Sequence, residues 1–208
     1  MEPLARYLSE HGGYSVFNVG YPSTRGDLAD HAATLASVVD SLEGIEEVSF
    51  VAHSMGNIVV RRFLADRTSD SRFHRMVMIA PPNQGSVAAA AWAENEIFSA
   101  ITGEAGQAMG QQWDELAATL AVPSFEFGII AGGRGDDRGF NPLIERDDDG
   151  TLLVEETYLE GAADHLVFPA IHSFVMYEEE VWAYTLRFLQ QGHFVSAADR
   201  RPIPATED

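Results

Sequence analysis

The segment around Ser54 constrains the fold more than any other part of the chain. Residues 48–52 form a short apolar run that is typical of a buried strand, and residues 56–63 repeat apolar side chains at helical spacing. Between them, Ala52 and Gly56 lie two residues before and two residues after Ser54, and both are small. This pattern predicts a buried strand, a sharp turn that only small neighbours tolerate, and a helix.

The rest of the chain continues the alternation of strand and helix patterns. Strand-like runs are expected at 14–19, 48–52, 75–80, 125–130, 151–159 and 164–170, and helical patterns at 28–42, 56–63, 86–120 and 178–190. Asp27 is a candidate N-cap of the helix at 28–42. Alternation of this kind predicts an α/β fold with a mostly parallel sheet and helices on both faces. Ligands of such sheets bind at the carboxyl ends of the strands.

The length of 208 residues fits a single domain, which we place at residues 1–195. Residues 196–208 are expected to be a flexible tail. Within the domain, residues 86–120 are an Ala-rich segment that is a possible lid or cap, and residues 132–149 are a long Gly- and Asp-rich loop. Long loops in compact domains are usually functional.

The charge of the chain argues against a nucleic-acid partner. There are 32 acidic residues against 13 basic residues, which gives a formal net charge of -19. Such a surface repels phosphate backbones and anionic lipid headgroups. The absence of cysteine excludes disulfides and a thiol nucleophile. No apolar stretch approaches the roughly 18 residues of a membrane span, so we expect a soluble chain that is cytoplasmic as written.

Ser54 is the candidate nucleophile. The sharp turn would push its hydroxyl out at the edge of the sheet, and the N–H of Met55 would be available to an oxyanion at the start of the following helix. The alternative interpretation is that Ser54 is an ordinary N-cap of that helix.

A serine nucleophile needs a base, and three histidines follow the acidic run at 147–149. His172 comes after the strand-like segment 164–170, where a loop rises from the sheet, and is favoured. His165 lies at the beginning of that segment and stays an alternative. His193 lies beyond the last helix, in a poor position to reach a strand end.

The acid that orients the base is expected in the run Asp147-Asp148-Asp149. Asp149 is chosen because Asp149-Gly150 predicts a tight turn, and Asp148 is the reserve. The alternatives are a solvated acidic turn or a cation site. The run lacks the spacing of an EF-hand loop, so we expect no metal.

At these residues the chain resembles small bacterial lipases and esterases of the α/β-hydrolase superfamily that carry the sequence A-H-S-M-G at their nucleophile. The resemblance runs from about residue 3 to residue 191. Residues 21–24, 80–86 and 148–151 are also similar to that family, as is the spacing of just over twenty residues between Asp149 and His172.

The resemblance implies a serine hydrolase that cleaves carboxylic esters, with small-molecule ester or lipid substrates and no cofactor. Ser54, Asp149 and His172 would be catalytic, and Met55 would contribute to the oxyanion hole. The alternative is a non-catalytic domain that keeps the hydrolase scaffold and binds a lipid or a protein partner. The sequence gives no indication of oligomeric state.

One part of the family pattern is missing from the sequence. In the family, a strand ending in His-Gly supplies a second oxyanion donor and lies between the strands that residues 14–19 and 48–52 resemble. It precedes the helix that residues 3–11 resemble. We therefore expect a hydrolase fold that lacks its N-terminal strands, because the sequence begins after them. A signal peptide could then precede it, which leaves the compartment open.

Overall fold

A four-stranded parallel sheet forms the centre of the computed structural model, which describes residues 1–20, 26–67, 70–86, 113–142 and 145–205. The strands follow one another in chain order across the sheet. They are β1 (Val48–His53), β2 (Phe73–Ile79), β3 (Glu126–Gly132) and β4 (Asp164–Phe168). These four strands confirm the sequence predictions at 48–52, 75–80, 125–130 and 164–170.

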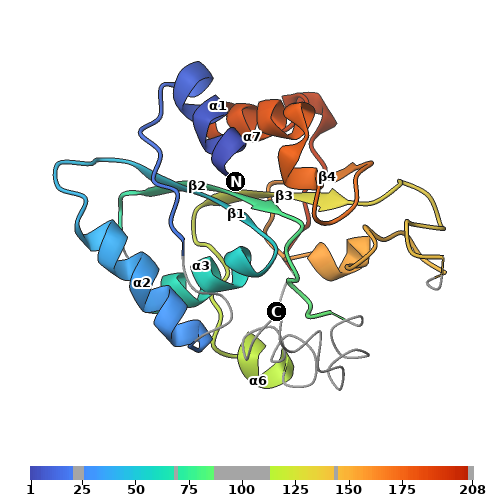
Figure 1. The fold of residues 1–208 in the computed structure, drawn as a ribbon, viewed down its shortest axis with the longest axis horizontal. Coiled ribbons are helices and arrows are strands. Elements are labelled where there is room, and N and C mark those ends of the chain that lie inside the picture. The colour runs from blue at the N-terminus through green and yellow to red at the C-terminus, as the bar shows by residue number, and fades with distance from the viewer. Residues whose placement is uncertain (21–25, 68–69, 87–112, 143–144, 206–208) are drawn as a thin grey trace.

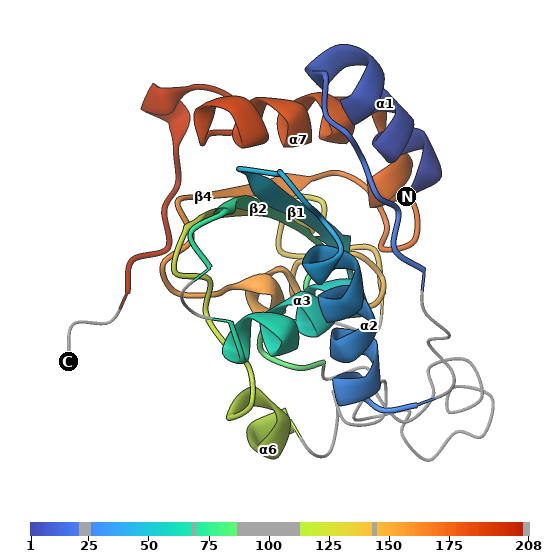
Figure 2. The same cartoon turned by 90° about the vertical axis from the view of Figure 1, so that its left-hand side faces the viewer.

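Helices cover both faces of the sheet (Figures 1 and 2). One face carries α1 (Glu2–Gly12) and α7 (Glu179–Gln191), and the other carries α2 (Leu28–Asp40) and α3 (Met55–Ala65). Four shorter helices are α6 (Trp113–Ala117), η1 (Val154–Thr157), η2 (Val175–Tyr177) and η3 (Ala197–Asp199). The predicted α/β class, with helices on both faces of a parallel sheet, is therefore confirmed.

The core has two halves, one on each side of the sheet. Met76 and Met78 of β2 pack towards α2 and α3, whereas Val77 and Ile79 pack towards α1 and α7. All four side chains are fully buried. Because successive residues of a strand point to opposite faces, a central strand covered on both sides has to be apolar throughout.

Local hydrogen bonds fix the start of α2 as the sequence predicts. The Asp27 carboxylate accepts from the backbone N–H of Asp30 at 2.9 Å, and the Asp30 carboxylate accepts from the N–H of Asp27 at 3.2 Å. This reciprocal arrangement satisfies N–H groups that the first turn of a helix leaves without partners.

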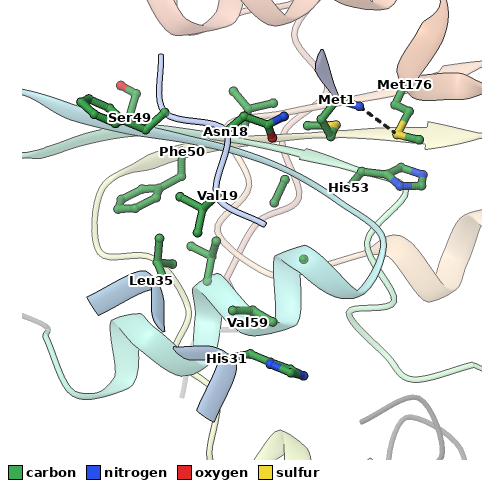
Figure 3. A pocket seen from close by; sticks show the side chains of 15 residues that line it. Met1, Asn18, Val19, His31, Leu35, Ser49, Phe50, His53, Val59 and Met176 are labelled. Carbon is green, nitrogen blue, oxygen red and sulfur yellow. Dashed lines mark hydrogen bonds between the residues drawn. The ribbon is translucent and has the colours of Figure 1, made fainter. Parts of the chain in front are cut away.

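The predicted strand at residues 14–19 is wrong. No strand is formed there, and Val16 and Phe17 are exposed. A strand needs a hydrogen-bonded neighbour, and β1 pairs only with β2 among the described residues. A cavity of about 340 Å³ lies between β1 and residues 17–19, as Figure 3 shows. The apolar pattern at 14–19 therefore has no strand to pair with among the described residues.

Two other predictions, the extended segment at 151–159 and the flexible tail, differ from the structure. Residues 151–159 contain the short helix η1 instead of a continuous extended segment. In the expected flexible tail, Ile203 exchanges backbone hydrogen bonds with residues 161 and 162, which holds that part of it against the domain. Most of the possible lid at 86–120 lies outside the described residues, as do residues 21–24 of the family resemblance.

Gly128 in β3 provides a test of the packing between the sheet and α7. A Cβ atom at this position would overlap Cε2 of Phe188, whose side chain is completely buried. We expect Gly128→Ala to lower the free energy of unfolding by about 1 to 3 kcal/mol, because a close-packed core tolerates extra volume poorly. Urea denaturation measures this.

Gly20→Ala is the matched control, because nothing lies within 4 Å of an added Cβ there. It should change the free energy of unfolding by less than about 1 kcal/mol. Equal stability of the two variants would contradict the proposed close packing at Gly128.

Candidate active site

The carboxyl ends of three strands bring the predicted site residues to one edge of the sheet. β1 ends at His53, directly before Ser54, and β3 ends at Gly132, before the loop that carries Asp149. β4 ends at Phe168, four residues before His172. In a parallel sheet these ends lie side by side, so residues far apart in the chain meet there.

Ser54 joins β1 to α3 in a strained conformation. Its φ is 52° and its ψ is −130°, outside the regions that residues other than glycine prefer. Such a conformation costs about 1 to 3 kcal/mol and persists only where the surroundings impose it. The side chain makes no cap hydrogen bond to α3, so the alternative interpretation of Ser54 as an ordinary N-cap is wrong.

Asn57, which the sequence analysis missed, braces this turn. Its side-chain amide donates to the backbone oxygen of Ser54 at 3.0 Å and to that of Ile79 at 3.2 Å. The residue is fully buried. It therefore ties the strained turn to the end of β2. A polar residue three positions after Ser54, on the first turn of a buried helix, was the available signal.

The ring of His172 lies between Ser54 and Asp149. Its Nδ1 is 2.7 Å from Oδ2 of Asp149, and its Nε2 is 2.9 Å from Oγ of Ser54. A carboxylate accepts hydrogen bonds, so Nδ1 carries the proton, and the neutral Nε2 accepts the hydroxyl proton of Ser54. The three predicted residues thus form a continuous chain of hydrogen bonds.

Asp149 is held by several contacts at once. Its Oδ1 accepts from the N–H groups of Thr151 and Leu152, at 2.9 and 2.7 Å. Its backbone oxygen accepts from the N–H of His172 at 2.8 Å, and its side chain is inaccessible to solvent. Gly132 makes room for it, since a Cβ there would lie 2.7 Å from Cβ of Asp149.

The neighbouring aspartates brace loops instead. Oδ1 of Asp148, the reserve acid, accepts from the N–H groups of Asn141 and Gly150. The carboxylate of Asp147 accepts from the N–H groups of Arg134 and Gly135. The described residues hold no group of three acidic, histidine or cysteine side chains suited to a metal. The acidic run is therefore used for backbone hydrogen bonds.

The other two histidines do not reach Ser54. His165 lies in β4, where its Nε2 is 3.3 Å from Oγ1 of Thr157 and its ring contacts Tyr158 edge to face. Burial lowers the pKa of His165 to about 4, and Asp164 partly offsets that effect. Nδ1 of His193 is buried after the end of α7.

His53 is a second histidine beside His172. The two ring centroids are 5.1 Å apart, and Nε2 of His53 lies 2.9 Å from the backbone oxygen of His172. Burial is the main cause that lowers the pKa of His53 to about 4, and the electrostatic effect of His172 adds to it. The site therefore combines one histidine hydrogen-bonded to the serine with another that stays uncharged near neutral pH.

The backbone around Met55 offers hydrogen-bond donors next to Ser54. α3 begins at Met55, and the N–H groups in the first turn of a helix have no acceptors within it. The helix dipole adds partial positive charge at the same end. An oxygen that becomes negative close to Ser54 is therefore favoured at this end of α3.

Comparison with solved structures identifies the fold. The chain is similar to a lipase from Bacillus licheniformis in its mature form, with 17% identity and a TM-score of 0.54 over 73% of this chain and 69% of the lipase. A metagenomic carboxyl esterase is 21% identical, with a TM-score of 0.63 over 81% of this chain and 57% of the esterase. Phospholipase PlaB from Legionella pneumophila is 14% identical, with a TM-score of 0.62 over 90% of this chain and 55% of the phospholipase.

The chain has the α/β-hydrolase fold. It spans little more than half the length of the carboxyl esterase and of the phospholipase. No protein-family model and no curated protein sequence matches it. Among the described residues, no helix of this hydrolase fold is both long enough and apolar enough to cross a membrane.

The buried His165 predicts a pH dependence of stability. Between its folded pKa of about 4 and its unfolded pKa of about 6.5, the unfolded chain binds more protons, so stability rises with pH. We expect the protein to lose stability as the pH falls through this window. The loss of stability between pH 7 and pH 5 should be smaller in His165→Gln than in the wild type, by about 1 to 2 kcal/mol.

Urea denaturation of both proteins at pH 7 and pH 5 measures the difference. His11→Gln, which changes an exposed histidine, is the control. It should lose as much stability between pH 7 and pH 5 as the wild-type protein. An unchanged pH dependence in the His165 variant would contradict the lowered pKa.

Proposed function

We propose that this protein is a serine hydrolase that cleaves carboxylic esters through an acyl-enzyme on Ser54. The observation that carries the proposal is the chain of hydrogen bonds from Ser54 Oγ through His172 to Asp149, at 2.9 and 2.7 Å. A hydroxyl, an imidazole and a buried carboxylate in this order are the groups that activate a serine for acyl transfer. The hydrolase fold and the lipase and esterase neighbours agree with it.

The strained turn supports the same role. In the α/β-hydrolase fold a sharp strand-to-helix turn presents the nucleophile above the sheet. Ser54 has a positive φ between β1 and α3, with the small Ala52 and Gly56 on either side. A serine that served only to cap the helix would need neither the strain nor a bond to an imidazole.

In the first half of the reaction, His172 Nε2 takes the proton of the Ser54 hydroxyl while Oγ attacks the ester carbonyl carbon. Asp149 keeps the Nδ1 proton in place and stabilises the imidazolium that forms. The N–H of Met55 donates to the carbonyl oxygen as it becomes negative. The carbon–oxygen bond to the alcohol then breaks, the alcohol takes the proton from His172, and the acyl group stays on Ser54.

In the second half, water replaces the alcohol. His172 removes a proton from a water molecule as that water attacks the acyl carbon, and then returns a proton to Oγ of Ser54. The carboxylic acid leaves and the resting state is restored. His53 does not compete as a base, because burial lowers its pKa to about 4.

The surface near the base favours substrates with an apolar part. Ile171 and Phe174, on either side of His172 in the chain, are 41% and 57% exposed, and Tyr177 of η2 is 47% exposed. Exposed apolar side chains beside a reactive group are a common feature of binding sites for apolar ligands. We therefore propose carboxylic esters, including lipid esters, as the substrate class.

Labelling with a fluorophosphonate tests the nucleophile. This probe phosphonylates an activated serine, so we expect one adduct on the wild-type protein, found by mass spectrometry on the peptide that contains Ser54. Ser54→Ala should give no adduct. Turnover of p-nitrophenyl acetate and of a longer p-nitrophenyl ester should likewise depend on Ser54.

A domain that only binds a lipid or a protein partner would show neither adduct nor Ser54-dependent turnover. That outcome would exclude the proposed activity and favour the binding alternative.

Replacing the acid tests the role of Asp149. Asp149→Asn keeps the shape of the side chain but favours the wrong proton arrangement on His172, so we expect the rate of ester hydrolysis to fall on the order of 10³- to 10⁴-fold. Asp148→Asn is the matched control, because Asp148 is equally buried in the same turn but bonds to Asn141 and Gly150.

The Asp148 variant should keep most of the activity. Steady-state hydrolysis of p-nitrophenyl acetate measures both variants, with circular dichroism to check folding. If the Asp148 variant lost more activity than the Asp149 variant, the assignment of the acid would be wrong.

A further inference from the structure

We propose that His53 is a positioning residue, which holds the backbone of His172 so that the imidazole of His172 stays within hydrogen-bond distance of Ser54. The proposal rests on the proposed function of Ser54 and His172. The contact that carries it joins Nε2 of His53 to the backbone oxygen of His172, at 2.9 Å. Neither the acid nor the nucleophile makes this contact.

The chemistry of the contact fixes the proton on His53. A backbone carbonyl can only accept a hydrogen bond, so Nε2 of His53 donates to it. The ring is therefore the Nε2–H tautomer. Burial lowers the pKa of His53 to about 4, so the ring stays neutral where His172 would work as a base. A charged ring at a centroid separation of 5.1 Å would oppose protonation of His172 during the reaction.

The contact gives His172 two hydrogen bonds to adjacent residues at the end of β1. His53 is the last residue of β1, and Ser54 follows it directly, so the backbone of both is fixed by the sheet. The N–H of Ser54 donates to the oxygen of Ile79 in β2 at 2.9 Å. From this rigid strand end, one side chain bonds to the oxygen of His172 and the next to its Nε2.

Apart from the contact with His53, the hydrogen bonds of His172 run to the hydroxyl of Ser54 and to the acid loop. The N–H of His172 donates to the oxygen of Asp149, and its Nδ1–H donates to the carboxylate of the same residue. These bonds fix His172 relative to Asp149 but not relative to β1. His53 supplies the bond between the base and the strand that carries the nucleophile.

The surroundings of His53 agree with a fixed side chain. It lies at one end of the cavity along β1, and Figure 3 shows its ring pointing away from the cavity interior, on the side where Met176 lies. Met176 belongs to η2 and lies two residues after the turn at 171–174 that carries His172. The ring thus lies beside the segment that carries the base, with its centroid 5.1 Å from that of the His172 ring.

The test compares two variants at one position. In His53→Gln the side-chain amide places an N–H donor near the position of Nε2, whereas His53→Leu has similar bulk and no donor. We expect His53→Leu to slow fluorophosphonate labelling of Ser54 and kcat of p-nitrophenyl acetate hydrolysis by roughly 10- to 100-fold, because small displacements of reacting groups have large effects on rate. KM should change little.

His53→Gln should stay within about threefold of the wild-type rate. Recovery by the amide separates donation to His172 from simple filling of space. If His53→Leu labels as fast as wild type, or if folded His53→Gln is as slow as His53→Leu, the proposal is overturned.

A second measurement needs no activity and no stable variant. In wild-type protein with ¹⁵N-labelled histidine, long-range NMR couplings show which ring nitrogen of His53 carries the proton. We expect the Nε2–H form between about pH 5 and pH 8. A ring that carries the proton on Nδ1, or that is charged at pH 7, would overturn the role of His53. Absence of Ser54 labelling in wild type would instead overturn the proposed function.

Discussion

Hydrogen bonding between the parallel strands fixes the geometry on which the whole site depends. β1, β2, β3 and β4 all pair in parallel, so the loops after β1, β3 and β4 leave the same edge of the sheet. Each loop carries one residue of the site. Because the two faces of the sheet are buried against helices, the strands cannot slide without moving every core side chain to the wrong place. The packing of the core therefore fixes the relative positions of the site residues.

The same sheet stabilises a strained serine. The conformation of Ser54 is unfavourable alone, yet it is held by the ladder bond to Ile79, by the start of α3 and by the buried amide of Asn57. Strain of this kind is maintained by the surrounding structure. Its consequence is that the hydroxyl stands away from α3 and faces an imidazole. Asn57, which lies outside the A-H-S-M-G sequence, contributes to holding this turn.

The successes and failures of the sequence analysis have a common physical basis. The four strands and the helices α2, α3 and α7 were predicted because hydrophobic periodicity reports how a segment will be buried, whereas α1 was expected only from the family resemblance. The segments at 14–19 and 151–159 were predicted as extended on similar patterns, and neither joins the sheet. A strand depends on a partner that is distant in the chain, and local pattern carries no information about that partner.

The sequence by itself determined the fold class, the sharp turn at Ser54 and a short set of possible partners, because small residues, apolar runs and chain order are local properties. It left open whether the acid is Asp148 or Asp149 and whether the base is His165 or His172. Only the tertiary structure decided which of these meet, since adjacent residues in a turn or a strand point in different directions. His172 bonds to Ser54 and Asp149 bonds to His172, whereas Asp148 binds its own loop and His165 is buried in β4.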